Sequence, residues 1–252
     1  MLSVILLGTG NVAQHLYNAL AALDTVNLKQ VYGRNTEALS YFKNIAVTNK
    51  PDHILNADVY LIAVNDDTIK AVSQLLLKKN GIVAHTSGAA PLAHIKTSNS
   101  GVFYPLQSFT KGKRVDFSTI PFCIEGSNNK TEATLLELAR KLSSKVYTIS
   151  SDQRKTIHLA AVLANNFSNH LFTIASSICQ ENKVPFAILH PLITETVEKI
   201  KHIGPREAQT GPAKRKDVLT MQSHMDQLEN PLHKKIYQLL SESIIHTYEE
   251  KL

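Results

Sequence analysis

The feature that most constrains the fold of this chain is a glycine motif near its N-terminal end, the segment Gly8-Thr9-Gly10-Asn11-Val12-Ala13. An apolar run, Val4 to Leu7, precedes it, and apolar residues at helical spacing follow it. A strand, a tight turn and a helix in this order are the context that a G-x-G-x-x-A dinucleotide-binding motif requires. The phosphates of such a ligand bind free N–H groups at the helix N-terminus. An ordinary strand–helix turn is the alternative interpretation.

The segment after the second predicted strand, Leu28 to Tyr32, indicates which dinucleotide binds. NAD-specific sites place an acid here for the ribose 2′-hydroxyl, whereas an arginine accommodates a 2′-phosphate. The nearest acid, Glu37, falls one turn into the next helix, and Arg34-Asn35-Thr36 stands in the loop itself. The sequence therefore predicts NADP, with an exposed loop arginine as the alternative interpretation of Arg34.

Two further apolar runs, 57–64 and 81–85, predict strands buried on both faces. Polar residues follow each run, and in a doubly wound sheet these strand ends lie in the crevice that binds the cofactor. The predicted cofactor-binding residues are Gly8, Thr9, Gly10, Asn11, Val12, Arg34, Asn35, Thr36, Val64, Asn65, Asp66, Thr86 and Ser87.

Strands alternate with helices four times, which predicts an α/β fold with a doubly wound, mainly parallel, Rossmann-like sheet. Further strands at 101–109, 121–126 and 146–149, with a helix at about 131–142, extend it. From Ser151 no strand-like run follows. We expect an NADP-binding domain over residues 1–150 and an all-helical substrate and dimerisation domain over residues 151–252.

The first helix of the second half is expected from roughly Asp152 to Asn182, and its polar residues form a stripe. At 100° per residue, His158, Asn165, Asn169 and Ser176 fall within about 20° of one line. Two interpretations remain open. In the structural interpretation, the stripe is a set of hydrogen-bonded polar groups in the core or faces another subunit. In the functional interpretation, the end of the stripe with His158 and Asn165-Asn166 faces the nicotinamide and the substrate.

Three more helices complete the predicted second half, at 184–201, around His224, and at about 231–250. Asp217 is positioned to cap the middle one. The preceding cations, Lys214-Arg215-Lys216, could hold a substrate carboxylate or phosphate, or could simply be solvated. A long central helix and an amphipathic final helix favour a homodimer through the helical domain.

Composition excludes several classes. The net charge is +6, and five of these six charges arise in residues 1–150, which carry 15 basic against 10 acidic residues, but no aromatic-interleaved basic stretch accompanies them. We therefore expect small anionic ligands and no nucleic acid. Cys123 and Cys179 form no Cys/His cluster, so we expect no metal and a reducing, cytoplasmic setting. No apolar run reaches about 18 residues, so we expect no membrane span.

The whole chain resembles the NADP-dependent reductase superfamily that includes pyrroline-5-carboxylate reductase, 6-phosphogluconate dehydrogenase and ketopantoate reductase. In particular it is similar to a bacterial group in which a Rossmann-like domain precedes a helical domain of unknown function. The resemblance implies the fold, NADP and dimerisation. It rests on the segments 8–13, Arg34, 64–67, 85–88, Tyr104-Pro105-Leu106-Gln107-Ser108-Phe109, His158 with Asn166-Phe167, and Thr210-Gly211-Pro212 with Arg215 and Asp217.

Two functional hypotheses follow. The first is an NADP(H)-dependent oxidoreductase that moves a hydride to or from a small carbonyl or imine at the domain junction. His158 would donate or accept the proton, Asn166 (alternatively Asn165) would orient substrate or nicotinamide, and Arg215 would anchor an anion. The second is a non-catalytic NADP-binding or sensor protein that dimerises. It is favoured because the Lys-x-x-x-Asn pair of the hydroxyacid-dehydrogenase relatives is missing.

Overall fold

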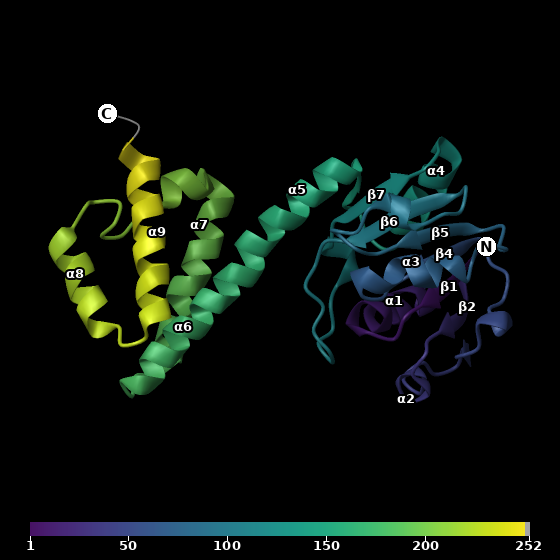
Figure 1. Cartoon of the computed structure of the whole chain (residues 1–252), viewed down its shortest axis with the longest axis horizontal. Helices are drawn as coiled ribbons and strands as arrows, with labels where there is room; N and C mark the ends of the chain where they lie inside the picture. Colours follow the sequence, from purple (N-terminus) through teal and green to yellow (C-terminus); the bar gives the residue numbers. More distant parts are fainter. Residues whose placement is uncertain (250–252) are drawn as a thin grey trace. The chain divides into compact units, whose positions relative to one another are not determined.

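The computed structural model describes residues 1–249 and contains two compact units, Met1–Val162 and a second one that begins at Leu163 (Figure 1). The first unit holds an eight-stranded sheet, and the second is helical, which confirms the α/β fold class. Helix α5 (Ser151–Ala161) falls in the first unit by its contacts. The assignment of functional domains to residues 1–150 and 151–252 stays a prediction.

The sheet has the strand order β3-β2-β1-β4-β5-β6-β7-β8. All neighbouring strands pair in parallel except β6 and β7, which are antiparallel, so the predicted mainly parallel sheet is confirmed. The order reverses at β1, and in such sheets ligands bind at the carboxyl edge beside this reversal. The strands are Leu2–Leu7, Val26–Tyr32, Ala46–Thr48, Val59–Ile62, Ile82–His85, Ser100–Pro105, Phe122–Gly126 and Val146–Thr148 for β1 to β8.

Both faces of the sheet are covered, because alternate residues of β1 enter two different clusters of buried side chains. Val4 and Leu6 pack in one cluster with residues of α1 (Asn11–Ala21) and α4 (Asn129–Arg140). Ile5 and Leu7 belong to the other cluster, together with Ile69 of α3 (Ile69–Gln74). Burial on both faces explains the uninterrupted apolar run from Val4 to Leu7. The short helix α2 (Thr36–Leu39) follows β2.

The segment after β4 forms a short turn and a short helix. The polar residues after this strand begin with a 3₁₀ turn at Asp66–Thr68, which leads into α3, and α3 ends at Gln74. Thr68 is the N-cap residue of α3, and no side chain caps it.

The predicted long helix is present, but it is not uniform. Between α5 and α6 (Ser168–Glu181) a π-helix occupies Val162–Phe167. Its i→i+5 hydrogen bonds need more residues per turn than an α-helix, so each residue rotates the chain by less than 100°. The wheel argument that aligned Asn165 with His158 is therefore wrong in its geometry, since it counts 100° through this segment.

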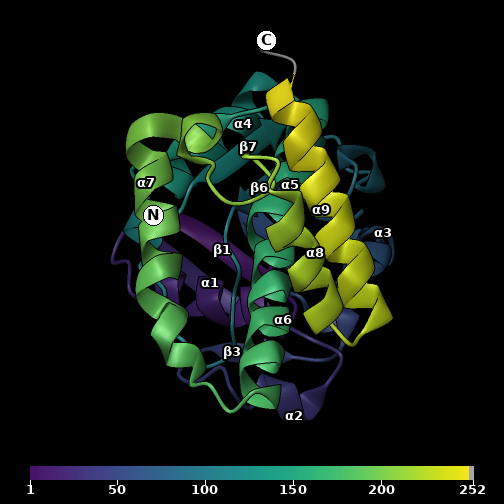
Figure 2. The same cartoon turned by 90° about the vertical axis from the view of Figure 1, so that its left-hand side faces the viewer.

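In the second unit, α7 (His190–Ala208), α8 (Val218–Gln227) and α9 (Pro231–Glu249) follow α6 and a 3₁₀ turn at Phe186–Leu189 (Figure 2). Helix α7 begins and ends later than the predicted 184–201, and it kinks at Gly204, whose φ is 75°. Asp217 caps α8 as predicted, since its Oδ1 accepts from Thr220 N–H at 3.1 Å. The predicted end of the last helix, Glu250, lies outside the described residues.

The described part of the second unit, 163–249, has almost no buried apolar side chains. Ala213 is the one hydrophobic residue of that range in the buried core, whereas many large apolar side chains of α6, α7 and α9 are exposed. Such a unit leaves unburied the surface that usually stabilises helix packing. Within residues 1–249, no helix is both long enough and apolar enough to cross a membrane.

Candidate functional site

The turn after β1 has a geometry that only glycine adopts without strain. Gly8 has a φ of 134°, and its N–H donates to the Tyr32 carbonyl at 2.8 Å. A Cβ at this position would lie 2.0 Å from the Ala63 carbonyl oxygen. By contrast, a Cβ on Gly10 would meet nothing within 4 Å. Gly8 therefore serves the turn, while Gly10 leaves open space beside the backbone.

The N-terminus of α1 is prepared for an anion. Its N-cap residue is Gly10, no side chain caps it, and its first turn contains no acidic residue. The first N–H groups of a helix have no partner within the helix, and the helix dipole adds partial positive charge there. Phosphate oxygens supply what these groups lack.

Two cavities adjoin this helix end, with volumes of about 350 and 450 Å³. They share Thr9, Arg34, Val64 and Thr68, so they form one continuous groove along the carboxyl ends of β1, β2 and β4. The first is also lined by Gly8, Tyr32, Gly33, Asn35 and Val72. The second is also lined by Gly10, Asn11, Val12, Ala63, Asn65, Thr86, Gln107 and Phe109.

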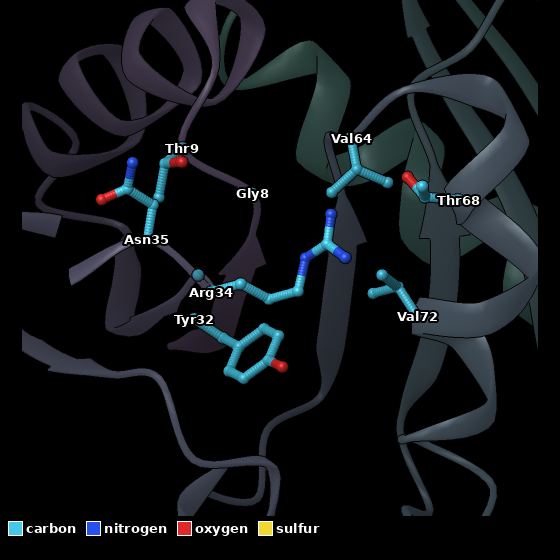
Figure 3. A pocket seen from close by; sticks show the side chains of 9 residues that line it. Gly8, Thr9, Tyr32, Arg34, Asn35, Val64, Thr68 and Val72 are labelled. Atoms are coloured by element: carbon cyan, nitrogen blue, oxygen red, sulfur yellow. The ribbon is translucent and has the colours of Figure 1, made fainter. Parts of the chain in front are cut away.

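Arg34 lies in the middle of the groove. Its side chain extends from the end of β2 toward Val64, with Asn35 and Thr9 to one side (Figure 3). Its neighbour Asn35 caps α2 by accepting from Ala38 N–H at 3.1 Å. The loop thus presents a cation to the groove. The first acidic residue after the loop is Glu37, which lies in the first turn of α2.

Ten of the thirteen predicted cofactor residues line one or both cavities, and Thr36, Asp66 and Ser87 line neither. The Thr36 hydroxyl lies 3.2 Å from Asn49 Nδ2. The Ser87 hydroxyl accepts from the N–H groups of Ala89 and Ala90 and so shapes its own turn. The binding roles of all thirteen residues stay predictions.

The segment after β6 forms a wall of the groove through Gln107 and Phe109, a role that the sequence analysis did not predict. The Asn11 amide donates to the Phe109 carbonyl at 3.1 Å, and His15 Nε2 lies 3.0 Å from the Thr110 carbonyl oxygen. These contacts fix the segment against α1. Only the topology reveals them, because the residues they join are about 95 positions apart.

A second group of residues meets beyond the end of β5. Tyr104 Oη lies 3.3 Å from His158 Nδ1, and the two rings pack edge to face with centroids 6.2 Å apart. A Cβ on Gly88 would lie 2.6 Å from His158 Nδ1 and equally close to Tyr104 Cζ. Burial raises the pKa of Tyr104 to about 12. The predicted catalytic histidine therefore has a tyrosine partner that sequence reasoning did not assign.

A buried arginine lies near this pair, and the sequence analysis did not assign it a role. Arg154 is fully buried, and its Nη1 donates to the carbonyls of Ser87, Gly88 and Ala90 at 3.3, 3.1 and 2.8 Å. Its Nη2 pairs with Glu125 of β7 at 3.3 Å. Arg154 joins the start of α5 to the loop after β5, one helical turn before His158.

The other predicted catalytic residues belong to the second unit. Asn165 and Asn166 are exposed within the π-helix. Arg215 is exposed and makes no hydrogen bond or salt bridge within residues 1–249, whereas Lys216 pairs with Glu249 at 2.8 Å. Their roles stay predictions.

The comparisons with known proteins agree with this geometry. The model of a family described as a domain of unknown function, DUF2520, matches residues 120–244. A crystal structure titled "putative NADP oxidoreductase" from Bacteroides fragilis has 34% identity over 97% of this chain and 98% of that one, with a TM-score of 0.89. The chain belongs to this family of Rossmann-like NADP oxidoreductases with a helical C-terminal domain.

More distant solved structures share the fold. A protein from Thermotoga maritima is 22% identical, with a TM-score of 0.74 over 98% of this chain and 99% of that one. A pyrroline-5-carboxylate reductase from Coxiella burnetii is 14% identical, with a TM-score of 0.57 over 99% and 98%. Among curated proteins none matches the sequence.

Proposed function

We propose that this chain uses NADP(H) to transfer a hydride to or from a small carbonyl or imine substrate. Its family makes it an NAD(P)-dependent oxidoreductase with NADP as cofactor. The observation that carries the proposal is Arg34, which lies in the groove where a dinucleotide ribose would carry its 2′-phosphate. The predicted substrate position, where the two domains meet, is part of the proposal.

The residues of the groove fit the cofactor. The uncapped N-terminus of α1 suits a pyrophosphate, and the open space beside Gly10 allows its close approach. Thr86 and Asn65 line the other end of the groove, toward β5. When bound, NADPH supplies a hydride to the carbonyl carbon, the oxygen takes one proton, and an alcohol and NADP⁺ result.

His158 is the proposed acid or base, because its ring lies just past the end of β5, the strand whose end carries Thr86. Asn166, or alternatively Asn165, is proposed to orient the substrate or nicotinamide, and Arg215 to anchor an anionic group. The residues of this chain thus bind, orient and exchange a proton, while the cofactor carries the electrons.

We also propose a homodimer through the helical unit. Support comes from the exposed apolar side chains of α6, α7 and α9 and from the lack of a buried core in residues 163–249. Apolar surface of this extent on a helical unit is typical of an obligate interface. A second copy of the chain would supply the missing core.

The test is a screen of 2-oxo acids, cyclic imines and related small carbonyls with NADPH, in which loss of reduced cofactor is followed by absorbance. We expect turnover with at least one class, and a loss of about 10²-fold or more in kcat for His158→Ala. Normal turnover by that variant would remove His158 from the mechanism. A chain that binds NADPH tightly but reduces no substrate would favour the sensor hypothesis instead.

A further inference from the structure

The Tyr104 phenol and the His158 imidazole are held together by the fold. Tyr104 lies on β6, opposite Cys123 of β7, and His158 lies on α5. Their Oη to Nδ1 distance of 3.3 Å exists because residue 88 has no Cβ. Arg154 adds rigidity, since it ties α5 to the backbone of Gly88.

The direction of this hydrogen bond decides which nitrogen of a neutral His158 carries the proton. A neutral imidazole has one donor nitrogen and one acceptor nitrogen. Within residues 1–249, the one hydrogen-bond partner of the Tyr104 hydroxyl is His158 Nδ1. The Tyr104 phenol is protonated at neutral pH, as a tyrosine ordinarily is, and burial raises its pKa further, to about 12. Donation to Nδ1 satisfies the hydroxyl hydrogen, which has no other acceptor within residues 1–249, and this direction leaves the imidazole proton on Nε2.

His158 Nε2 is accessible to a ligand. It makes no hydrogen bond in the described part of the chain, and it is not among the buried polar atoms that lack a partner. A hydrogen-bonding group on a substrate can therefore reach Nε2, whereas Tyr104 occupies Nδ1.

We propose that Tyr104 holds His158 in the tautomer with the proton on Nε2, so that His158 presents an N–H donor to the carbonyl oxygen or imine nitrogen of the substrate. This inference rests on the proposed function and narrows it. A neutral imidazole N–H polarises a carbonyl and stabilises the negative charge that develops on its oxygen. By microscopic reversibility the same N–H···O contact stabilises the alkoxide-like oxygen in either direction of hydride transfer.

The direct test is spectroscopic and needs no substrate. Long-range ¹H–¹⁵N correlation spectra of the full chain with ¹⁵N-labelled histidine distinguish protonated from bare ring nitrogens. They are recorded at about pH 8, above the ordinary imidazole pKa of about 6.5. His158→Gln assigns the signals among the 11 histidines.

We expect a protonated Nε2 and a bare Nδ1 in the unmutated chain, and a gain of the Nδ1–H tautomer in Tyr104→Phe. Tyr104→Phe keeps the ring that packs on Gly88, so it isolates the hydroxyl. A proton on Nδ1 in the unmutated chain would overturn the proposal, as would an unchanged tautomer in Tyr104→Phe.

Kinetics separate this proposal from the proposed function. Tyr104→Phe should lower kcat about tenfold or more and leave the KM for NADPH unchanged, whereas Tyr147→Phe, at an exposed tyrosine of β8, should change neither. His158→Gln, which keeps an N–H near the place of Nε2, should retain more activity than His158→Ala. If His158→Ala turns over normally, His158 has no catalytic role and both proposals about it fail. If His158→Ala loses activity but the spectra show a proton on Nδ1, the proposed role of Tyr104 fails and the proposed catalytic role of His158 stands.

Discussion

Gly10 and Gly88 make a matched pair of test positions at the residue scale. A Cβ on Gly10 meets open space where phosphates would bind, and Gly10 has a φ of −75° that alanine adopts readily. Gly10→Ala should therefore leave the free energy of unfolding nearly unchanged and weaken NADPH binding. A Cβ on Gly88 collides with His158, so Gly88→Ala should cost about 1–3 kcal/mol of stability.

Urea unfolding and NADPH titration measure both properties for both variants. Equal NADPH affinity in Gly10→Ala and the unmutated chain would contradict the placement of the pyrophosphate. Full stability of Gly88→Ala would show that Tyr104 and His158 do not pack against residue 88.

His85 gives the chain a predictable dependence of stability on pH. It is fully buried on β5, and burial together with the charge of Arg154 lowers its pKa to about 3. The unfolded chain protonates this histidine below about pH 6.5, so the folded state loses stability as pH falls from there toward about 3. The slope is about 1.4 kcal/mol per pH unit, or roughly 2–3 kcal/mol between pH 6.5 and 4.5.

Urea unfolding across this pH range tests the prediction, because most carboxylates stay ionised there in both states. His85→Asn keeps an acceptor for the Ser87 N–H and should flatten the slope by about one proton. An unchanged slope in that variant would show that other groups cause it.

The residues of the cofactor groove were predictable from the sequence, whereas the residues that contact or position His158 were not. Gly8 and Arg34 could be read from the sequence because a glycine turn and a loop cation have a local meaning. Arg154 and Tyr104 act through partners 29 to 67 positions away, so the local sequence does not reveal these contacts, although Tyr104 belongs to a segment that carries the family resemblance. An arginine near a helix start looks like ordinary surface charge until the fold places Glu125 beside it.

At the scale of elements, Arg154 joins α5 both to β7, where Ser151 also bonds Glu125, and to the loop after β5. Arg154→Met removes the charged partner of the Glu125 carboxylate, which keeps its bonds from Ser151, and the donor to three backbone carbonyls. Breaking a buried ion pair from one side costs about 3–5 kcal/mol. Arg140→Met, at an exposed arginine of α4, is the matched control and should stay within about 0.5 kcal/mol.

Urea unfolding of the two variants measures this difference. A cost below about 1 kcal/mol for Arg154→Met would mean that water or a rearrangement replaces its bonds. In that case the position of His158 against Gly88 would not depend on Arg154.

Strands and helices were mostly predictable because apolar runs and glycines mark them. The buried run Val4 to Leu7 of β1 and the whole of β4 are continuously apolar, and the Asp217 cap marks the start of α8. The π-helix at Val162–Phe167 was not predictable, since it shares the composition of the α-helices around it. The π-helix also changes which residues share a helix face. A helical wheel drawn at 100° per residue therefore cannot decide whether Asn165 or Asn166 faces the site.

At the scale of the whole molecule, the exposed apolar side chains of the helical unit predict a dimer. Sedimentation should give twice the 27.9 kDa of one chain. Ile200→Glu places a charge among Leu192 and Ile203 on the exposed apolar face of α7 and should produce monomer or loss of fold. His202→Glu, on the opposite face of the same helix, is the control. A monomer at micromolar concentration in the unmutated chain would contradict the proposed assembly.

The central claim, an NADP site centred on Arg34, is tested most directly by titrating NADPH and NADH into the unmutated chain, Arg34→Ala and Arg140→Ala. Charge-assisted hydrogen bonds contribute about 1.5–3 kcal/mol, which corresponds to roughly 10- to 100-fold in Kd. We predict that the unmutated chain binds NADPH more tightly than NADH by about this factor. Arg34→Ala should lose this preference, and Arg140→Ala should keep it. Tighter binding of NADH, or an unchanged preference in Arg34→Ala, would contradict the account.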